Sequence, residues 1–334
     1  MVACKMSIKK IFDRIKRVDK CEEFKTTYGI TLSDEKGKTK FAANFYKSAI
    51  VNYKGYVNGS KDLYSEVIAE SLVNDSFIKD WLNLIPVRPE HFKINHPNRD
   101  ENVDALKITN RKEEILAKLL FYQGNIDGLG YIFDYQTPLK EARNDSYGKI
   151  DLLGYNKDDK CYSVIELKYR PSGSEETLLR CVLEAYTYYK LLDINQIKSA
   201  VGHDGIQKLK ELSGYKHTNE SELVVLFDEK SCTKDDGGAE TNLMLRIDSN
   251  EPNNPRYPSK TVVSQQFKEC KELIDSDKRN SLRTLCDKIL EQEPKLKQIR
   301  FVVLRVDTES KSNYPTNIKG WSRKLDRLYR AETL

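Results

Sequence analysis

Residues 148–168, GKIDLLGYNKDDKCYSVIELK, constrain the fold of this chain more than any other stretch. Two apolar runs, 150–155 and 161–167, flank the polar segment 156–159. Apolar runs of this length with a turn between them are typical of a β-hairpin. We therefore expect two antiparallel strands here, at the centre of the fold.

Each strand of this hairpin carries an acid where an unpaired carboxylate is costly to bury. Asp151 lies inside the first strand, and Glu166 and Lys168 end the second. Because side chains alternate along a strand, Glu166 and Lys168 point to one face while Leu167 points into the core. Two carboxylates and a lysine on neighbouring strands are the groups that a magnesium-dependent phosphodiester hydrolase requires.

The acid-x-lysine triplet recurs in this charged chain, at 34–36, 158–160 and 269–271. Those copies fall in expected turns or on charged helical faces, where solvated charge explains them. The triplet at 166–168 differs because it ends an apolar strand and follows Asp151 on the strand that should pair with it. A structural ion pair between Asp151 and Lys168 stays open as the alternative.

The segments around the hairpin predict an α/β fold with a mixed sheet. Residues 110–122 should form a helix and 131–137 a strand, followed by the hairpin. Residues 175–192 are expected to form a second helix, with acids in its first turn, and 223–227 a buried strand. The order is helix, three strands, helix, strand, which places helices against a sheet.

The chain outside this core divides into two predicted parts. Residues 1–105 should be mainly helical, with an amphipathic helix at 6–20, helices at 62–73 and 75–84, and a loop or linker at 86–104. The remainder, residues 106–334, should be the main domain around a core at 110–228, with helix at 264–291, a strand at 299–306 in the same sheet, and a basic C-terminal helix at 319–330.

Composition indicates a globular protein that neither spans nor binds a membrane. Of the 334 residues, 39% are hydrophobic and 32% charged, and no apolar run approaches the roughly 18 residues of a membrane span. The basic N-terminus lacks the apolar stretch of a signal peptide, so we expect a cytoplasmic protein. The seven scattered cysteines and four histidines lack the spacing of a zinc site. A net charge of +5 permits a nucleic-acid partner without requiring one.

The expected chemistry follows from the hairpin. Asp151 and Glu166, with the main-chain carbonyl of Leu167, form an all-oxygen set that suits Mg²⁺, for which Mn²⁺ could substitute. The ion would polarise a phosphate and lower the pKa of the attacking water. Lys168 would hold that water and the developing charge.

Asp151, the hairpin, Glu166-x-Lys168 and the amphipathic helix that follows resemble the PD-(D/E)xK nuclease superfamily. The resemblance implies a restriction-endonuclease-like, three-layer α/β/α core of order α-β-β-β-α-β over residues 110–228. It also implies that Asp151 and Glu166 bind the metal and that Lys168 is the catalytic lysine.

Further site residues are implied by the same resemblance. Many members add an acid from the first core helix, where Glu113 and Glu114 stand, and we favour Glu114. No proline precedes Asp151, as in divergent members, and the glutamine–tyrosine signature of some members appears only approximately, as Glu184 with Tyr188.

Two arginines and several partners complete the expectations. Arg170 and Arg180 flank the site and could hold phosphates. The resemblance implies a metal-dependent nuclease, favouring DNA over RNA and an endonuclease, in restriction, anti-phage defence or repair. Cutting both strands favours a homodimer, and the N-terminal region could bind a further partner or effector. The alternative is an inactive nucleic-acid-binding or assembly protein of the same fold.

Overall fold

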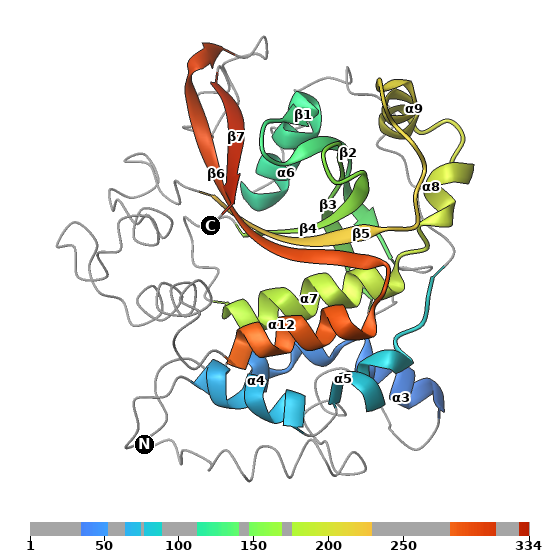
Figure 1. Ribbon diagram of the computed structural model, residues 1–334, viewed down its shortest axis with the longest axis vertical. Helices are drawn as coiled ribbons and strands as arrows, with labels where there is room; N and C mark the ends of the chain where they lie inside the picture. Colours follow the sequence, from blue (N-terminus) through green and yellow to red (C-terminus); the bar gives the residue numbers. More distant parts are fainter. Residues whose placement is uncertain are drawn as a thin grey trace, which may run out of the picture.

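The computed structural model describes residues 35–52, 64–74, 77–88, 112–139, 147–168, 176–228, 281–311 and 327–333. Within these residues a curled mixed β-sheet lies between helices (Figure 1). Helix α6 covers one face of the sheet, and helices α7 and α12 cover the other. The prediction of an α/β fold with a mixed sheet is confirmed.

The sheet has seven strands, and their spatial order is their chain order. The strands are β1 (Asn125–Ile126), β2 (Gly130–Pro138), β3 (Lys149–Asn156), β4 (Cys161–Lys168), β5 (Ser221–Asp228), β6 (Leu296–Lys311) and β7 (Arg327–Thr333). Neighbours from β1 to β4 are antiparallel, as are β6 and β7. Strands β4, β5 and β6 run parallel, so long connections join them.

The described helices fall into two groups. Those before the sheet are α3 (Glu35–Ala42), α4 (Tyr64–Asn74) and α5 (Phe77–Asp80), with short 3₁₀ segments η2 (Phe45–Lys47), η3 (Ala49–Asn52) and η4 (Leu82–Leu84). The others are α6 (Lys112–Gln123), α7 (Leu178–Leu191), α8 (Asn195–Ser199), α9 (Asp204–Glu211) and α12 (Ser281–Gln292). None of these helices is long and apolar enough to cross a membrane.

The predicted hairpin forms as β3 and β4, paired from Leu152 with Ile165 to Asn156 with Cys161. Side chains at alternate positions enter different cores. Leu152, Ile165 and Leu167 pack against α6, whereas Leu153 and Val164 pack on the side of α7. This alternation decides which face the polar residues at the end of β4 must share.

Helix α7 is the crossover between β4 and β5, and it begins later than predicted. The Thr177 hydroxyl caps it by accepting a hydrogen bond from the N–H of Arg180 at 3.2 Å. The expected acids of the first turn therefore precede the helix, and Glu176 becomes available for contacts elsewhere.

The N-terminal helices share one core with the sheet. Thr177 donates its hydroxyl to the carbonyl of Val51 at 2.5 Å and its N–H to the Asn52 side chain at 2.8 Å. The Glu66 carboxylate accepts N–H groups of Ser281 and Leu282, at the start of α12. Residues on both sides of the predicted boundary at position 105 are thus packed together.

The C-terminal prediction needs correction. Residues 327–330, expected in a basic helix, lie in β7, which pairs antiparallel with β6. Strand β6, which joins the same sheet as predicted, would otherwise expose an unpaired edge. Pairing buries Tyr329 and Ala331 at alternate positions. The rest of the predicted 319–330 helix, and the predicted helix at 6–20, lie outside the described residues.

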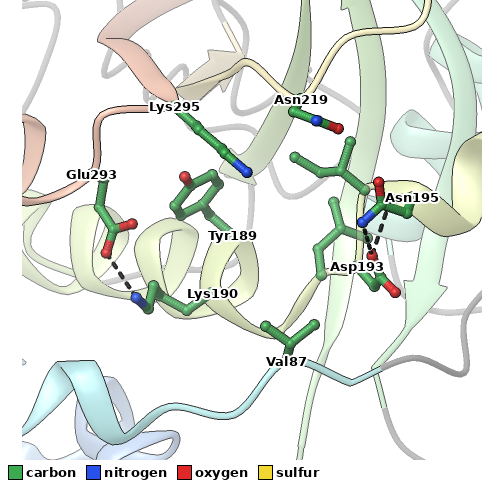
Figure 2. Close-up of a pocket in the computed structure, with 10 residues that line it drawn as sticks. Val87, Tyr189, Lys190, Asp193, Asn195, Asn219, Glu293 and Lys295 are labelled. Carbon is green, nitrogen blue, oxygen red and sulfur yellow. Dashed lines mark hydrogen bonds and ion pairs between the residues drawn. The ribbon is translucent and has the colours of Figure 1, made fainter.

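A pocket of about 250 Å³ opens at the C-terminal end of α7, beside the start of β6 (Figure 2). Its wall includes the ion pair of Lys190 with Glu293, 2.8 Å apart, and the side chains of Asn219 and Lys295. No acid or lysine of the β3–β4 hairpin lines it. The pocket is therefore separate from the residues that the sequence predicts to be functional.

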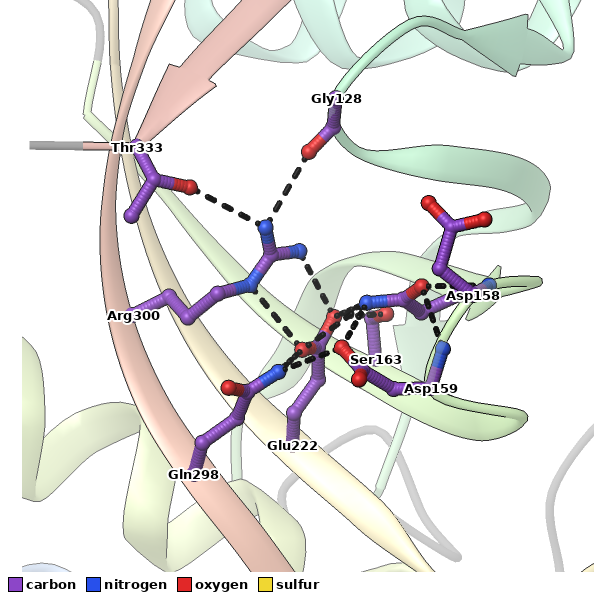
Figure 3. Close-up of polar contacts among 9 residues, drawn as sticks. Gly128, Asp158, Asp159, Ser163, Glu222, Gln298, Arg300 and Thr333 are labelled. Carbon is purple, nitrogen blue, oxygen red and sulfur yellow. Dashed lines mark hydrogen bonds and ion pairs between the residues drawn. The ribbon is translucent and has the colours of Figure 1, made fainter.

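A buried ion pair links strands β5 and β6 (Figure 3). The Glu222 carboxylate on β5 is fully buried and accepts two hydrogen bonds from the Arg300 guanidinium on β6, at 2.9 and 3.0 Å. Ser163 and Gln298 each donate a further bond at 2.7 Å. Arg300 also donates to the Gly128 carbonyl at 3.1 Å, which ties the β1–β2 turn to β6.

We predict that Arg300→Met lowers the free energy of unfolding by about 3 kcal/mol, because it leaves a buried carboxylate without its cation. Denaturant titration would measure the loss. The matched control is Lys297→Met, which removes a cation from the same strand at the surface, where its pair with Glu220 is largely solvated. Equal stability of the two variants would contradict the importance of the buried pair.

Candidate active site

The fold brings Asp151, Glu166 and Lys168 together on the α7 side of the sheet. The β3–β4 ladder ends at Leu152 with Ile165, so continuing its register places Asp151 opposite Glu166. Opposite residues of an antiparallel pair share a face, and Lys168 lies two positions beyond Glu166 on the same face. The structure thus brings these three side chains close enough for their charges to act on one another.

Both oxygens of Asp151 are hydrogen-bonded. Its Oδ2 accepts the main-chain N–H of Leu167 at 3.0 Å, and its Oδ1 accepts the side-chain amide of Gln136 at 2.9 Å. Gln136 comes from β2, the strand on the other side of β3. The carboxylate is thus held between two neighbouring strands, in one orientation.

Lys168 lies among carboxylates. Its Nζ is 2.5 Å from Glu166 Oε1, 2.6 Å from Glu176 Oε2 and 3.4 Å from Glu184 Oε2. Its side chain is 12% exposed, so these charges interact with little screening by water. Lys168 thus forms ion pairs with these three glutamates, and not the structural ion pair with Asp151 that was the alternative.

Two tyrosine hydroxyl groups hold the Glu184 carboxylate in place. The Tyr188 hydroxyl donates to Glu184 Oε1 at 2.8 Å and lies 3.0 Å from the Tyr46 hydroxyl. Gly148, just before β3, lies so close that a Cβ there would be 2.4 Å from the Tyr188 hydroxyl. The glycine thus lets α7 approach the strand that carries Asp151.

Glu166 is the most enclosed acid of the site. The residue is 2% exposed, and its Oε2 is buried with no hydrogen-bond partner among the residues the structure describes. Leaving a buried carboxylate oxygen unpartnered is costly, so this atom calls for a ligand or bound water.

Burial and mutual repulsion shift the pKa values of these groups. Burial, and then the charge of Glu184, raise the pKa of Asp151 from 3.8 to about 6, against the opposing charge of Lys168. Burial and the charges of Asp151 and Glu184 raise the pKa of Glu166 well above its usual value. Burial alone would lower the pKa of Lys168, but the surrounding glutamates outweigh it and raise it well above 10.5. Lys168 is accordingly an ammonium and not a base.

The other predicted residues have different positions. Glu114 on α6 pairs with Lys149, at the start of β3, at 2.8 Å, and its role in the site stays a prediction. The Leu167 side chain is buried in the core beneath α6, as expected. Arg180 pairs with Glu176 at 2.9 Å, close to Lys168. Arg170 lies outside the described residues.

Three residues of the site were not predicted. Gln136 follows from strand register, because the pairs Tyr135 with Leu152 and Thr137 with Ile150 place it across from Asp151. Glu176 was predicted in the first turn of a helix, but α7 begins after it, and its carboxylate pairs with Lys168 and Arg180. Tyr46 comes from the N-terminal region, and no local pattern marks it as a neighbour of Tyr188.

The oxygen ligands of this cluster fit a hard cation better than a soft one. In the part of the chain that the structure describes, no three His, Cys, Asp or Glu side chains are grouped so that they could hold a metal. Two opposed carboxylates with one unpartnered oxygen still suit Mg²⁺, which binds through one or two carboxylates and keeps several waters.

Comparison with known proteins adds no relative. No family model, no curated protein and no solved structure matches this chain.

The raised pKa of Asp151 predicts how stability varies with pH without metal. The folded protein holds this proton more tightly than the unfolded chain, so stability falls as pH rises from about 4 to about 6 and stays lower above that. Asp151→Asn should therefore raise the free energy of unfolding at pH 8 in EDTA by about 2 kcal/mol, and by little at pH 4.

Urea unfolding at several pH values would test this difference. Asp158→Asn, which changes an exposed acid in the turn of the same hairpin, is the control and should change stability little at either pH. A variant at position 151 that is less stable than wild type at pH 8, or equally shifted at every pH, would refute the prediction.

Proposed function

We propose that this protein is a metal-dependent nuclease that hydrolyses phosphodiester bonds in nucleic acid, with a restriction-endonuclease-like core. The core would comprise α6, β2, β3, β4, α7 and β5. In support, these elements follow the α-β-β-β-α-β order, with β4 and β5 parallel and joined through α7. Helices α6 and α7 also lie on opposite faces of the sheet.

One observation carries the proposal. Asp151 and Glu166 oppose each other on neighbouring strands, Lys168 lies on the same face, and a buried oxygen of Glu166 lacks a partner. Buried acceptors without a partner are uncommon, so a ligand or bound water is expected at this oxygen. Two carboxylates against one lysine also leave negative charge for a cation to neutralise.

Asp151 and Glu166 would hold Mg²⁺ or Mn²⁺, with the Leu167 carbonyl as a further ligand. The ion supplies polarisation of the phosphate and a lower pKa of its bound water. Lys168, kept protonated by its glutamates, would orient the attacking water and stabilise the charge that develops on the phosphate. Glu184, fixed by Tyr188, holds the ammonium in place.

Substrate binding would require the metal, because the site carries more negative than positive charge. In the described part of the chain, four carboxylates, Asp151, Glu166, Glu176 and Glu184, lie around the cations of Lys168 and Arg180. A polyanion would be repelled until a divalent ion reduces this excess. Arg180 could then exchange its bond with Glu176 for one with a phosphate.

DNA is favoured over RNA, cleavage would be internal, and the setting would be restriction, anti-phage defence or repair within the cytoplasm. One site of this kind cuts one strand, so a homodimer would serve for duplex cleavage.

The alternative, a binding or assembly protein without cleavage, draws support from a different observation. Lys168 is fully paired with glutamates, and the described residues contain no group of three metal-ligating acids. Such a protein would bind nucleic acid with or without metal and never cut it.

The test is incubation of the full chain with plasmid, linear and single-stranded DNA and with RNA, in Mg²⁺, Mn²⁺ or EDTA. Wild type should cut at least one substrate only when metal is present. Asp151→Asn and Lys168→Met should each lower the rate at least about 100-fold, because they remove charges required in the transition state.

Lys157→Ala and Asp158→Asn, both exposed in the hairpin turn, are matched controls that should cut like wild type. Melting curves would check that each variant is folded. Metal-independent cutting, or full activity of Asp151→Asn, would show the site to be wrong. Binding without cleavage under every condition would favour the alternative.

A further inference from the structure

A row of three oxygen-bearing side chains crosses the sheet. Flanking pairs place Gln136 on β2 across from Asp151 on β3, and the register of β3 with β4 places Asp151 across from Glu166. Residues that oppose one another across antiparallel strands share one face. The amide and both carboxylates therefore line up on the α7 side.

Gln136 is held in an unusual backbone conformation. Its φ is 50°, in the left-handed region that residues other than glycine rarely adopt. The pairs Tyr135 with Leu152 and Thr137 with Ile150 fix the strand on both sides of it. An uncommon φ held within a paired strand points to a demand on the side chain.

The two ends of the amide have different surroundings. The Gln136 amide nitrogen donates to Asp151 Oδ1 at 2.9 Å, whereas Oε1 is buried with no hydrogen-bond partner among the described residues. Glu166 Oε2 is likewise buried with no hydrogen-bond partner among the described residues. Two unsatisfied acceptors thus flank Asp151, one contributed by each neighbouring strand.

A hard cation binds oxygen atoms whose lone pairs are not already taken by hydrogen-bond donors. No three acids, histidines or cysteines in the described residues are grouped so that they could bind one together, so any third side-chain ligand beside the two carboxylates would be a neutral oxygen. Amide carbonyls serve this purpose for oxygen-seeking cations.

We infer that Gln136 is a ligand of the divalent cation, through Oε1, and that its amide nitrogen at the same time orients Asp151. The inference rests on the proposed function, because it concerns the same cation. It adds a neutral third side chain to the two carboxylates.

Titration calorimetry of the full chain with MnCl₂, without nucleic acid, tests this directly. Gln136→Gly removes the amide while suiting the left-handed backbone, so the fold should survive. It should weaken Mn²⁺ binding at least about 10-fold. Gln136→Glu keeps an oxygen at that position and should bind within about 3-fold of wild type, or more tightly.

Gln292→Ala is the matched control, since Gln292 on α12 also has a buried Oε1 without a partner in the described chain. It should bind Mn²⁺ like wild type. Unchanged binding by Gln136→Gly would overturn the inference and leave the proposed function standing. Equal loss in Gln136→Gly and Gln136→Glu would also overturn it, since only the hydrogen bond to Asp151 would then matter. Absence of binding by wild type itself would instead remove the metal site on which both proposals rest.

Discussion

An excess of buried negative charge between the sheet and α7 governs this structure. Lys168 and Arg180 cannot neutralise Asp151, Glu166, Glu176 and Glu184 together, and the raised pKa values of Asp151 and Glu166 reflect the cost of charging poorly solvated carboxylates side by side. The strands hold the acids together because their side chains follow strand register. The apolar packing of the hairpin therefore keeps the charges close, and a cation would relieve the repulsion.

Segments far apart in sequence cooperate to hold this arrangement. The N-terminal region contacts the start of α7 through Val51 and Asn52, and Tyr46 lies against Tyr188. Helix α7 in turn provides Glu184, which contacts Lys168 on β4. Residues 46–52 thus support the candidate site structurally.

The sequence predicted the parts of the fold that depend on local patterns. The hairpin carries its own signal, because two apolar runs flank a polar turn, and the positions of Asp151, Glu166 and Lys168 follow from strand alternation. The helix predicted at 327–330 is wrong. Helical spacing can be read from neighbouring residues, whereas pairing with the edge of β6 depends on a distant part of the chain. Gln136 and Tyr46 could not be predicted, since strand register and the packing of distant segments bring them to the site. Glu176 could not be predicted either, because it reaches Lys168 only where α7 begins as late as Leu178.

Asp151 and Glu166 are proposed to hold a divalent cation between the side chains of β3 and β4. Anomalous diffraction from crystals grown with Mn²⁺ tests it most directly. We predict an anomalous peak between these two carboxylates, with Lys168 close by. Crystals that bind Mn²⁺ elsewhere, with no peak between Asp151 and Glu166, would contradict it.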